Sequence, residues 1–391
     1  MARRPGTPRL LRELNDRAAL DLLLSSGPLT RSKIGQLTGL SKVTASQLLA
    51  RLEERGLVEV VGSTEGGRGP NAALYAVVPS SAYVAGLAVG PETVTAGIAD
   101  ITGQLVAETT VEPGDAEDPV ALVHSSVQKA ARRAHVSMAR LHSVVIGTPG
   151  VIDPRRGDMR YSFDLPAWHE GVISALRGDL RRPVTIENDA NLAAVAERAV
   201  GVATGVSDFV LVWFVLGPGM AVMLGDRLHR GVSGGAGEIG WLPVPGAPLP
   251  DDVGYSGKEP LGASFQSLVG RQAILALAAR HAVPGDEVGE VVAAAVGDGP
   301  GGTAFLDELA RRIAVGVASV AVVLDPELVV LGGRLGGRGG AELSGRVQRE
   351  VARLCPANPR VEASTVTGNP VLRGALHAAV EQARDGVFTT S

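Results

Sequence analysis

Three consecutive polar residues, Glu187, Asn188 and Asp189, close a predicted strand at 183–187 and lead into a predicted helix at 190–202. A carboxylate such as that of Asp189 is suited to accept a proton from a hydroxyl group, while Asn188 and Glu187 can hydrogen-bond neighbouring hydroxyls. The commoner use of an aspartate at this place is structural, because it caps the helix that follows. The residues alone leave both interpretations open.

Three glycine-rich segments are further candidates for chemistry. The segment 234–241 carries Glu238 on a glycine loop, which suits either the binding of a polyol or a solvated turn. The segment 147–153 can line a cleft or form a rigid turn. Residues 331–337 follow a predicted strand and could admit a nucleotide, although a glycine-rich strand exit alone is a weak signal.

Two similar segments each place a Gly-Pro pair between apolar runs, Gly90-Pro91 in the first and Gly217-Pro218 in the second. This repeat is typical of a duplicated strand-turn-strand unit. A glycine turn in such a unit normally wraps a phosphate, but proline has no backbone N–H to offer a phosphate oxygen. The two turns therefore indicate both a shared ancestry and the loss of a phosphate-handling reaction.

The first 80 residues predict a helix-turn-helix. A helix at 10–25 precedes a helix at 31–38 that Thr30 can cap, and a third helix begins after Ser41 and stops at Gly56. A short glycine turn between the second and third helices is the helix-turn-helix arrangement. In the first helix we expect the buried face to hold Leu10, Leu14, Ala18, Leu22 and Leu23. In the second we expect Ile34 and Leu37 to be buried.

The third helix divides into two faces at about 100° per residue. Ala45, Leu48, Leu49 and Leu52 should face the core, and the outward residues are Lys42, Val43, Thr44, Gln47 and Arg51. An exposed valine suits a thymine methyl and a glutamine suits an adenine edge. The side chains of Ser41, Lys42 and Arg51 suit phosphates.

Two strands flanking the loop 63–71 then predict a wing, with Arg68 at its tip placed to enter a narrow minor groove. A helical bundle that binds protein, or a dimerisation module, is the alternative for this segment.

Charge and composition agree with a DNA-binding head on an acidic body. Residues 1–80 hold 11 Lys/Arg and 7 Asp/Glu, a net charge of +4, so in a chain of net charge –4 the remainder carries –8. The single cysteine, Cys355, excludes an internal disulfide and any multi-cysteine zinc site. No apolar run reaches membrane-spanning length and the first residues lack a signal-peptide core, so we expect a cytoplasmic protein with no membrane partner.

The body alternates between strand-like and helical patterns. Predicted strands lie at 83–89, 94–99, 104–109, 143–147, 183–187, 209–216, 220–224 and 327–331. Predicted helices lie at 118–134, 190–202, 264–281, 304–324, 341–354 and 371–384. We expect a surface loop with a short helix at 284–303. This pattern favours an α/β fold of two lobes, each beginning with a hairpin.

Taken together, these residues resemble the ROK family, which joins bacterial repressors and sugar kinases on an actin-like, two-lobed fold. The resemblance covers nearly the whole chain. It runs through the head and the segments 99–103, 147–153, 187–191, 236–240, 325–333 and 372–376. It implies a winged helix-turn-helix at 1–80, a first lobe at 81–198 with the C-terminal helix 371–391 packed back on it, and a second, dimerising lobe at 199–370.

Departures from the family pattern bear on activity. Family kinases carry Asp-x-Gly-x-Thr in the first phosphate loop, where this chain has Ala88, Gly90 and Glu92, and Gly-Thr-Gly in the second, where it has Gly217-Pro218-Gly219. The family's zinc-binding histidine is replaced by Trp241, and the region 251–262 has no cysteine. The resemblance therefore implies neither metal nor nucleotide cofactor and no kinase activity, since phosphoryl transfer depends on such positioned groups.

The remaining residues Glu187, Asn188, Asp189, Glu238 and Trp241 resemble the sugar-contacting half of the family's site. They favour a DNA-binding regulator of the repressor type that binds a double-stranded operator as a homodimer or tetramer and senses a sugar or sugar phosphate. Two alternatives stay open at this stage: an active sugar kinase with a DNA-binding head, and a regulator with no small-molecule ligand.

Overall fold

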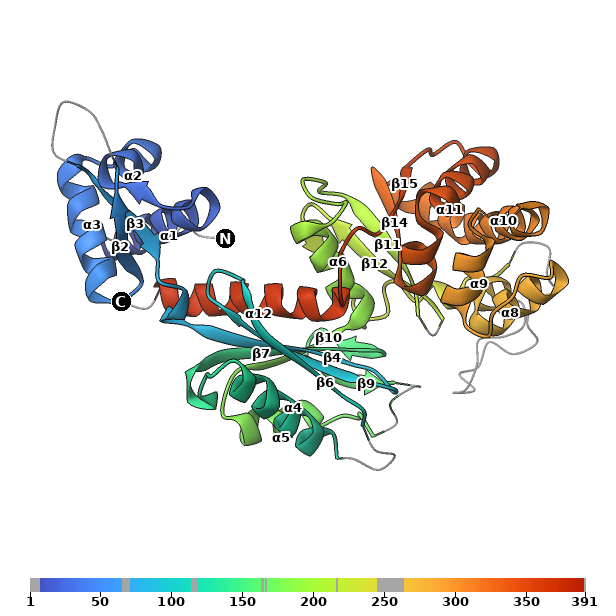
Figure 1. Ribbon diagram of the computed structural model, residues 1–391, viewed down its shortest axis with the longest axis horizontal. Coiled ribbons are helices and arrows are strands. Elements are labelled where there is room, and N and C mark those ends of the chain that lie inside the picture. The colour runs from blue at the N-terminus through green and yellow to red at the C-terminus, as the bar shows by residue number, and fades with distance from the viewer. Residues whose placement is uncertain are drawn as a thin grey trace.

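The computed structural model describes residues 8–64, 71–113, 118–162, 165, 167–215, 217–244, 264–297 and 299–389. A small N-terminal head lies at one end of an elongated body that contains two five-stranded sheets (Figure 1). The α/β fold of a winged head and two lobes is therefore confirmed. No helix within the described ranges is long and apolar enough to cross a membrane.

The head consists of three helices and a three-stranded sheet of order β1-β3-β2. Its elements are α1 (Pro8–Ser26), β1 (Leu29–Thr30), α2 (Arg31–Thr38), α3 (Lys42–Glu54), β2 (Val58–Ser63) and β3 (Ala73–Val77). Both predicted caps are present: the Thr30 hydroxyl accepts a hydrogen bond from the Lys33 N–H and the Ser41 hydroxyl from the Thr44 N–H. These caps satisfy N–H groups that a helix start leaves unpaired.

The first sheet of the body has the order β10-β7-β4-β5-β6, and it begins with the predicted β4–β5 hairpin. Its strands are β4 (Tyr83–Val89), β5 (Val94–Asp100), β6 (Leu105–Val111), β7 (Leu141–Thr148) and β10 (Val184–Asn188). Helices α4 (Pro119–Arg133) and α5 (Val172–Leu180) cover one face, and α12 (Pro370–Thr389) crosses the other (Figure 1). The short strands β8 (Val151–Asp153) and β9 (Asp158–Tyr161) pair with each other.

The second sheet has the order β13-β12-β11-β14-β15, again with a leading hairpin, β11–β12. Its strands are β11 (Phe209–Phe214), β12 (Pro218–Leu224), β13 (Arg227–Leu228), β14 (Leu328–Gly332) and β15 (Arg360–Ala363). Helices α7 (Phe265–Val269), α8 (Arg271–Arg280), α9 (Val288–Ala295), α10 (Gly299–Leu324) and α11 (Gly333–Leu354) belong to this lobe. Helix α6 (Asp189–Val200) packs against β11 and β12 as well as against α12, and so contacts both lobes.

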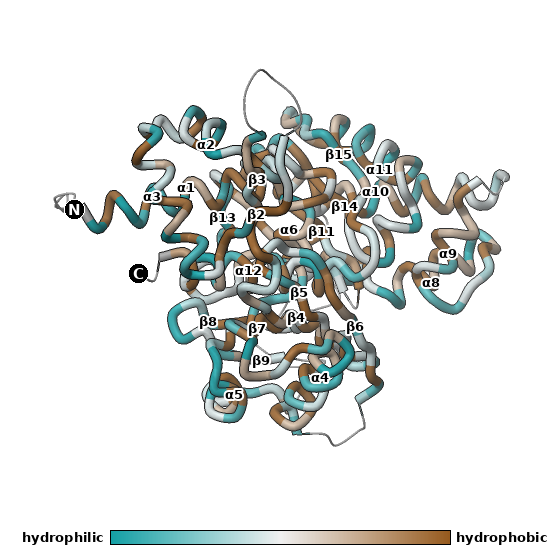
Figure 2. Tube along the Cα trace, turned by 60° about the vertical axis from the view of Figure 1, so that its left-hand side comes forward, coloured by the Kyte–Doolittle hydropathy of each residue, from teal (hydrophilic) through white to brown (hydrophobic). Residues whose placement is uncertain are grey.

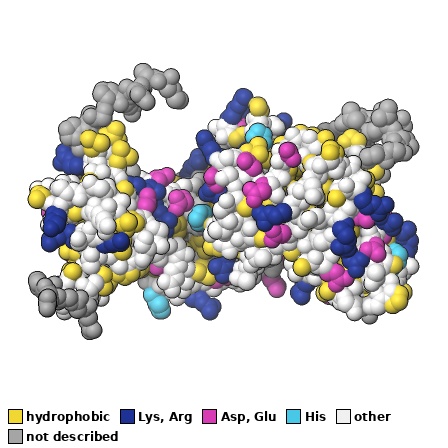
Figure 3. Space-filling view, turned by 90° about the horizontal axis from the view of Figure 1, so that it is seen from above, with side chains coloured by type: hydrophobic (Ala, Val, Ile, Leu, Met, Phe, Trp, Pro, Cys, Tyr) yellow, Lys and Arg dark blue, Asp and Glu magenta, His cyan; other side chains and the backbone are white. Residues whose placement is uncertain are grey.

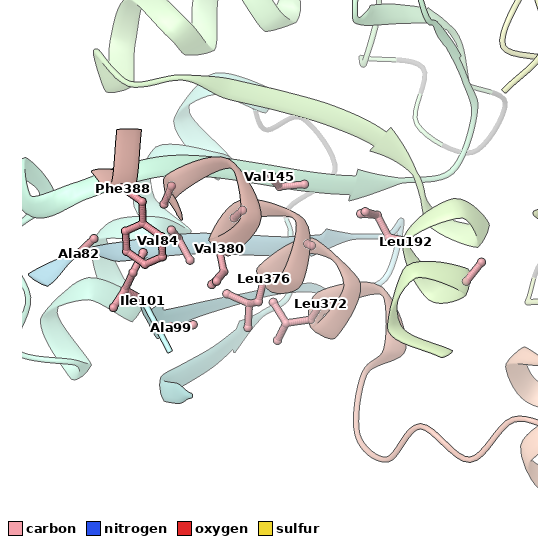
Figure 4. Packing of buried hydrophobic residues seen from close by; sticks show 14 of the residues in the cluster. Ala82, Val84, Ala99, Ile101, Val145, Leu192, Leu372, Leu376, Val380 and Phe388 are labelled. Atoms are coloured by element: carbon pink, nitrogen blue, oxygen red, sulfur yellow. The ribbon is translucent and has the colours of Figure 1, made fainter. Parts of the chain in front are cut away.

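Helix α12 lies close to the first sheet because two strands present glycine beneath it. A Cβ on Gly86 of β4 would lie 2.8 Å from Leu376, and one on Gly147 of β7 would lie 2.3 Å from Val371. Leu372, Leu376 and Val380 fill the space between the helix and the strands (Figure 4). The central strands of both sheets form the hydrophobic interior (Figure 2).

Several sequence predictions about the elements are wrong. In α1 the buried apolar residues are Ala19, Leu20 and Leu23, whereas Leu10, Leu14 and Ala18 are exposed, so the buried face is rotated from the predicted one. Leu37 is also exposed, since α2 uses Ile34 and Gly35 to face the core.

In the second lobe, the predicted helix 264–281 is two helices, because Gly270 separates α7 from α8 with non-helical dihedral angles. The predicted surface segment 284–303 contains α9, which buries Val288, Val291 and Val292 in the lobe's core. Helix α10 begins five residues earlier than predicted, at Gly299, whereas α11 is kinked at Gly340, so its second half matches the predicted helix 341–354 and its first half, from Gly333, was not predicted. Strands β8, β9, β13 and β15 and helix α5 were not predicted.

Candidate nucleic-acid interface and carboxylate cluster

Helix α3 has the two faces that its sequence predicts. Ala45, Leu48, Leu49 and Leu52 are at most 1% exposed, while the opposite face leaves Val43 67% exposed. Lys42, Thr44 and Gln47 are exposed beside Val43. The head thus presents one row of polar side chains and an uncovered valine on its third helix, and Figure 3 shows further Lys and Arg side chains on the head at the left end of the molecule. Arg68 of the wing loop lies outside the described residues.

Arg51 is placed differently from its neighbours on α3. Its Nη2 donates to Oδ1 of Asp16 at 2.6 Å, and Asp16 is a buried residue of α1. Arg55 approaches the other carboxylate oxygen at 3.9 Å. Because a buried carboxylate needs a partner, Arg51 joins α1 to α3, which gives it a structural role beside the predicted phosphate contact.

The head is fixed to the body through the last turns of α12. Nη1 of Arg17 pairs with Asp385 at 2.7 Å, and its guanidinium lies 5.5 Å from the centre of the Phe388 ring. Nη2 of Arg55, at the end of α3, donates to the Val387 carbonyl at 2.6 Å. The end of α3 therefore contacts the helix that crosses the first lobe.

Asn188, rather than Asp189, caps α6. The Asn188 Oδ1 accepts from the Asn191 N–H at 3.2 Å, and its Nδ2 donates to the Gly150 carbonyl at 3.1 Å. The capping role considered for Asp189 thus belongs to its neighbour. Asp189 is the first residue of the helix, where the partial positive charge of the helix N-terminus favours a carboxylate.

Asp189 and Glu187 both contact the second lobe. Nε1 of Trp213, on β11, donates to Asp189 Oδ2 at 3.1 Å. Nε of Arg230 donates to Oε2 of the buried Glu187 at 2.7 Å. Neither Trp213 nor Arg230 was identified from the sequence.

Glu238 lies near Asp189, although the two come from different lobes. Partial burial raises the pKa of the Glu238 carboxyl, and the negative charge of Asp189 raises it further. Two glycines allow the Glu238 loop to pack in this position. A Cβ on Gly234 would lie 1.9 Å from the Ile152 carbonyl oxygen, and a Cβ on Gly237 would lie 1.9 Å from the Met220 carbonyl oxygen. We call Glu187, Asp189 and Glu238 the carboxylate cluster.

Trp241 follows on the short helix at Ile239–Trp241 and is half-buried. Groups of His, Cys, Asp and Glu able to hold a metal ion are absent from the part of the chain that the structure describes. The region 251–262, from which the sequence predicts no zinc ligand, lies outside that part.

Both Gly-Pro turns are occupied by the protein's own groups. The Gly90 N–H donates to the Thr93 carbonyl within the first turn, and Glu92 pairs with Arg334 of α11 at 3.5 Å, across the two lobes. At the second turn, a Cβ on Gly217 would lie 2.6 Å from the side-chain oxygen of Gln266. Among the described residues, a carboxylate stands beside the first turn and an amide side chain lies against the second, unlike the open row of N–H groups that cradles phosphate.

Comparison with known proteins decides the family. The model of the ROK family matches residues 84–381, and that of the MarR family matches residues 13–69. The chain belongs to the ROK family. It is 26% identical over 348 residues to the xylose repressor of Caldicellulosiruptor bescii, covering 84% of this chain and 85% of that one. It is 24% identical over 242 residues to the Escherichia coli dual regulator NagC, covering 61% and 59%.

Solved structures share the fold. A ROK family transcriptional regulator described as a homologue of the E. coli MLC protein has a TM-score of 0.74 at 18% identity and covers 97% of both chains. A ROK hexokinase from Thermus thermophilus has a TM-score of 0.63 at 27% identity, covering 78% of this chain and 100% of that one. Two sequence relatives matched over 84% of this chain are named a xylose repressor and a putative xylose repressor, and residues 13–69 match the MarR family, so this ROK protein is a DNA-binding transcriptional regulator.

Proposed function

We propose that this ROK protein represses transcription from an operator read by α3, and that an uncharged sugar bound at the carboxylate cluster releases it. The observation that carries the DNA half is the exposed face of α3, opposite four fully buried residues. Lys42 and Ser41 are assigned to phosphates, Val43 and Thr44 to thymine methyl groups, and Gln47 to an adenine edge. Arg68 is assigned to the minor groove. Because its partner is DNA, we place the protein in the cytoplasm.

The charge of the cluster favours a neutral effector over a sugar phosphate. Arg230 is bonded to Glu187, so its charge is already matched, and the pKa of Glu238 is raised first by burial and then by the negative charge of Asp189. A phosphate dianion beside Asp189 and Glu238 would meet repulsion, whereas sugar hydroxyls donate hydrogen bonds to carboxylates. Trp241 is assigned to the apolar face of the sugar ring, and the xylose repressors that this chain resembles carry the name of a neutral sugar.

The operator half is tested by mobility shifts on the DNA upstream of the protein's own gene. Gln47→Ala should weaken binding by about 1–3 kcal/mol, or roughly 5- to 150-fold, because a bidentate contact to a base is lost. Gln36→Ala, an exposed glutamine of α2, is the matched control and should change binding less than twofold. Equal effects of the two substitutions would contradict the assignment of α3.

The effector half is tested by thermal unfolding of the full chain with xylose, glucose and N-acetylglucosamine and with their phosphates. A neutral sugar should raise the melting temperature, because a ligand bound only by the folded state stabilises it. Asp189→Asn should remove this shift. A shift with phosphates alone would refute the neutral effector, and no shift with any compound would support a regulator without a ligand.

The oligomeric state follows from the way such heads read DNA. A two-fold dimer places two α3 helices in major grooves one helical turn, or a multiple of it, apart. We therefore propose a homodimer, or a tetramer built from two of them, on an inverted repeat. Sedimentation of the protein with and without a duplex carrying such a repeat measures both states, and a monomer on a single half-site would contradict the proposal.

A further inference from the structure

A cluster of arginines lies on the body next to the head, where α4 and α5 end. Arg132 and Arg133 occupy the last turn of α4, Arg140 precedes β7, and Arg181 and Arg182 join α5 to β10. Arg182 Nη2 donates to the Ala139 carbonyl at 2.6 Å, which brings the two turns together. We call these five arginines the basic rim.

The basic rim is not neutralised by nearby acids. Residues 129–142 contain four Lys/Arg and no Asp or Glu, although residues 81–391 carry a net charge of –8. Asp179 lies in the last turn of α5, two residues before Arg181, but its Oδ2 is 2.6 Å from Nδ1 of His124. Arg132, Arg133 and Arg181 are exposed, and no described carboxylate pairs with them. Burial lowers the pKa of neighbouring His142, and the charge of Arg182 lowers it further.

The rim adjoins the junction between head and body. Arg140 Nη2 donates to the carbonyl of Ser80, in the segment that joins β3 to β4, at 2.5 Å, and its guanidinium lies 4.9 Å from the Tyr83 ring centre. His142 and Pro183 line a groove of about 350 Å³ together with Gly386 and Val387 of α12. Val387 is also the residue that Arg55 of α3 contacts. The groove is therefore lined by Pro183, which follows Arg182 of the rim, and by Val387, whose carbonyl accepts from Arg55 at the end of α3.

Helix C-termini attract cations in any protein, since the partial negative charge of the last carbonyls favours them. That effect acts within the last turn of each helix and accounts for one or two arginines there. It does not explain why these turns come together on an acidic body, beside a DNA-binding head. A group of exposed arginines beside such a head fits the phosphate backbone of a duplex.

We propose that the basic rim is a second DNA-contacting surface, which binds the phosphate backbone flanking the site read by α3. The proposal rests on the DNA-binding function above and extends it from the head to the body. Its contacts are to phosphates, so they add affinity and salt dependence without sequence preference.

The test uses the full chain, a labelled random-sequence duplex of 40 base pairs and a range of salt concentrations. The triple variant R132Q/R133Q/R181Q removes three exposed charges, and R280Q/R338Q/R349Q removes three exposed arginines of the second lobe as a control. Each phosphate contact contributes about 0.9 to the slope of log affinity against log salt, so the rim variant should lose about 2.7. A fourfold rise in salt would then weaken wild type about 40-fold more than the variant, and the control should match wild type.

An unchanged slope in the rim variant, with DNA binding intact, would overturn the rim while leaving the proposed function standing. Absence of DNA binding in the wild-type chain would instead overturn the proposed function. A duplex of 16 base pairs separates the two surfaces further, because it is filled by the head and should show no difference between the rim variant and wild type. A change of oligomeric state in sedimentation would identify the rim as an interface between copies and refute the proposal. Should the triple variant unfold, R132Q/R133Q alone should lose about 1.8 of the slope.

Discussion

Replacing Asp16 by alanine should loosen the head far more than its position on a surface helix suggests. The Asp16 side chain is 9% exposed and bonds Arg51 at 2.6 Å, with Arg55 at 3.9 Å. Breaking a fully buried ion pair costs about 3–5 kcal/mol. Arg51 keeps 36% of its side chain exposed and can be rehydrated when its partner is lost. A hydrogen bond to a charged group is worth about 1.5–3 kcal/mol, so we expect a loss of about 2 kcal/mol.

Hydrogen exchange of the full chain, followed by mass spectrometry, measures this loss locally. A change of about 2 kcal/mol in the opening free energy speeds exchange roughly 30-fold in peptides from α1 and α3. Peptides from β4 and β7 should be unchanged. Glu13→Ala is the matched control on the same helix. Glu13 forms an i,i+4 ion pair with Arg9, whose side chain is 71% exposed. Such a pair contributes about 0.3–0.5 kcal/mol, or about a twofold change.

Equal exchange in D16A and E13A would refute the reasoning, because it would mean that Asp16 is as well solvated in the folded head as Glu13. The same variants decide how Arg51 acts on DNA. If Arg51 acts by holding α3 against α1, D16A and R51A should weaken binding alike and leave the salt slope unchanged. If it contacts a phosphate, R51A alone should lower the slope by about 0.9.

Three further outcomes follow from packing and charge. Gly374→Ala should destabilise the chain by about 1–3 kcal/mol in urea unfolding, because its Cβ would lie 1.8 Å from the Leu192 carbonyl of α6. Gly386→Ala is the control on the same helix: its Cβ meets open space, so the substitution should be neutral or stabilising. Glu238→Gln should raise the melting temperature at neutral pH while weakening sugar binding. Because the pKa of Glu238 is raised in the folded state, its ionised form opposes folding, and the gain in melting temperature should vanish once pH falls below about 4.5. Burial lowers the pKa of His377, so the unfolded chain takes up the proton first and stability should fall as pH drops below about 6.5; His377→Gln should flatten this dependence in thermal unfolding at pH 5.5 and 7.5.

Features that depend on local signals could be predicted from the sequence. The limits and faces of α3 follow from one cap, one period of about 100° per residue and one terminal glycine, all within residues 41–56. The buried face of α1 could not be found in this way, since it depends on which side meets β3 and α12. That contact buries Asp16 beside Arg51 and leaves Leu14 in solvent.

The sequence predicts a short helix within 284–303 but neither the bounds nor the burial of α9, because the glycine and acidic residues around it are typical of surface loops. Two of those acids, Glu287 and Glu290, form a capping box that begins the helix. The spacing of these acids was therefore a usable signal. No comparable signal marked Trp213 or Arg230, which reach the carboxylate cluster from 24 and 43 residues away in sequence. Their contacts exist only once the two lobes are assembled.

The contacts between the lobes also set how strong an effector must be. On the side of the former phosphate turns, Glu92 and Arg334 are 72% and 36% exposed, and such a pair contributes about 0.2–1 kcal/mol. A ligand shifts a conformational equilibrium only by its difference in affinity for the two states. A tenfold preference supplies 1.4 kcal/mol, which exceeds that pair. Under the proposed function, a sugar at Asp189 would act on the first turn of α6, which packs along α12, and the last turns of α12 hold Arg17 and Arg55 of the head. We therefore expect the effector's preference for one lobe arrangement to have to outweigh the Trp213–Asp189 and Arg230–Glu187 contacts as well as this exposed pair.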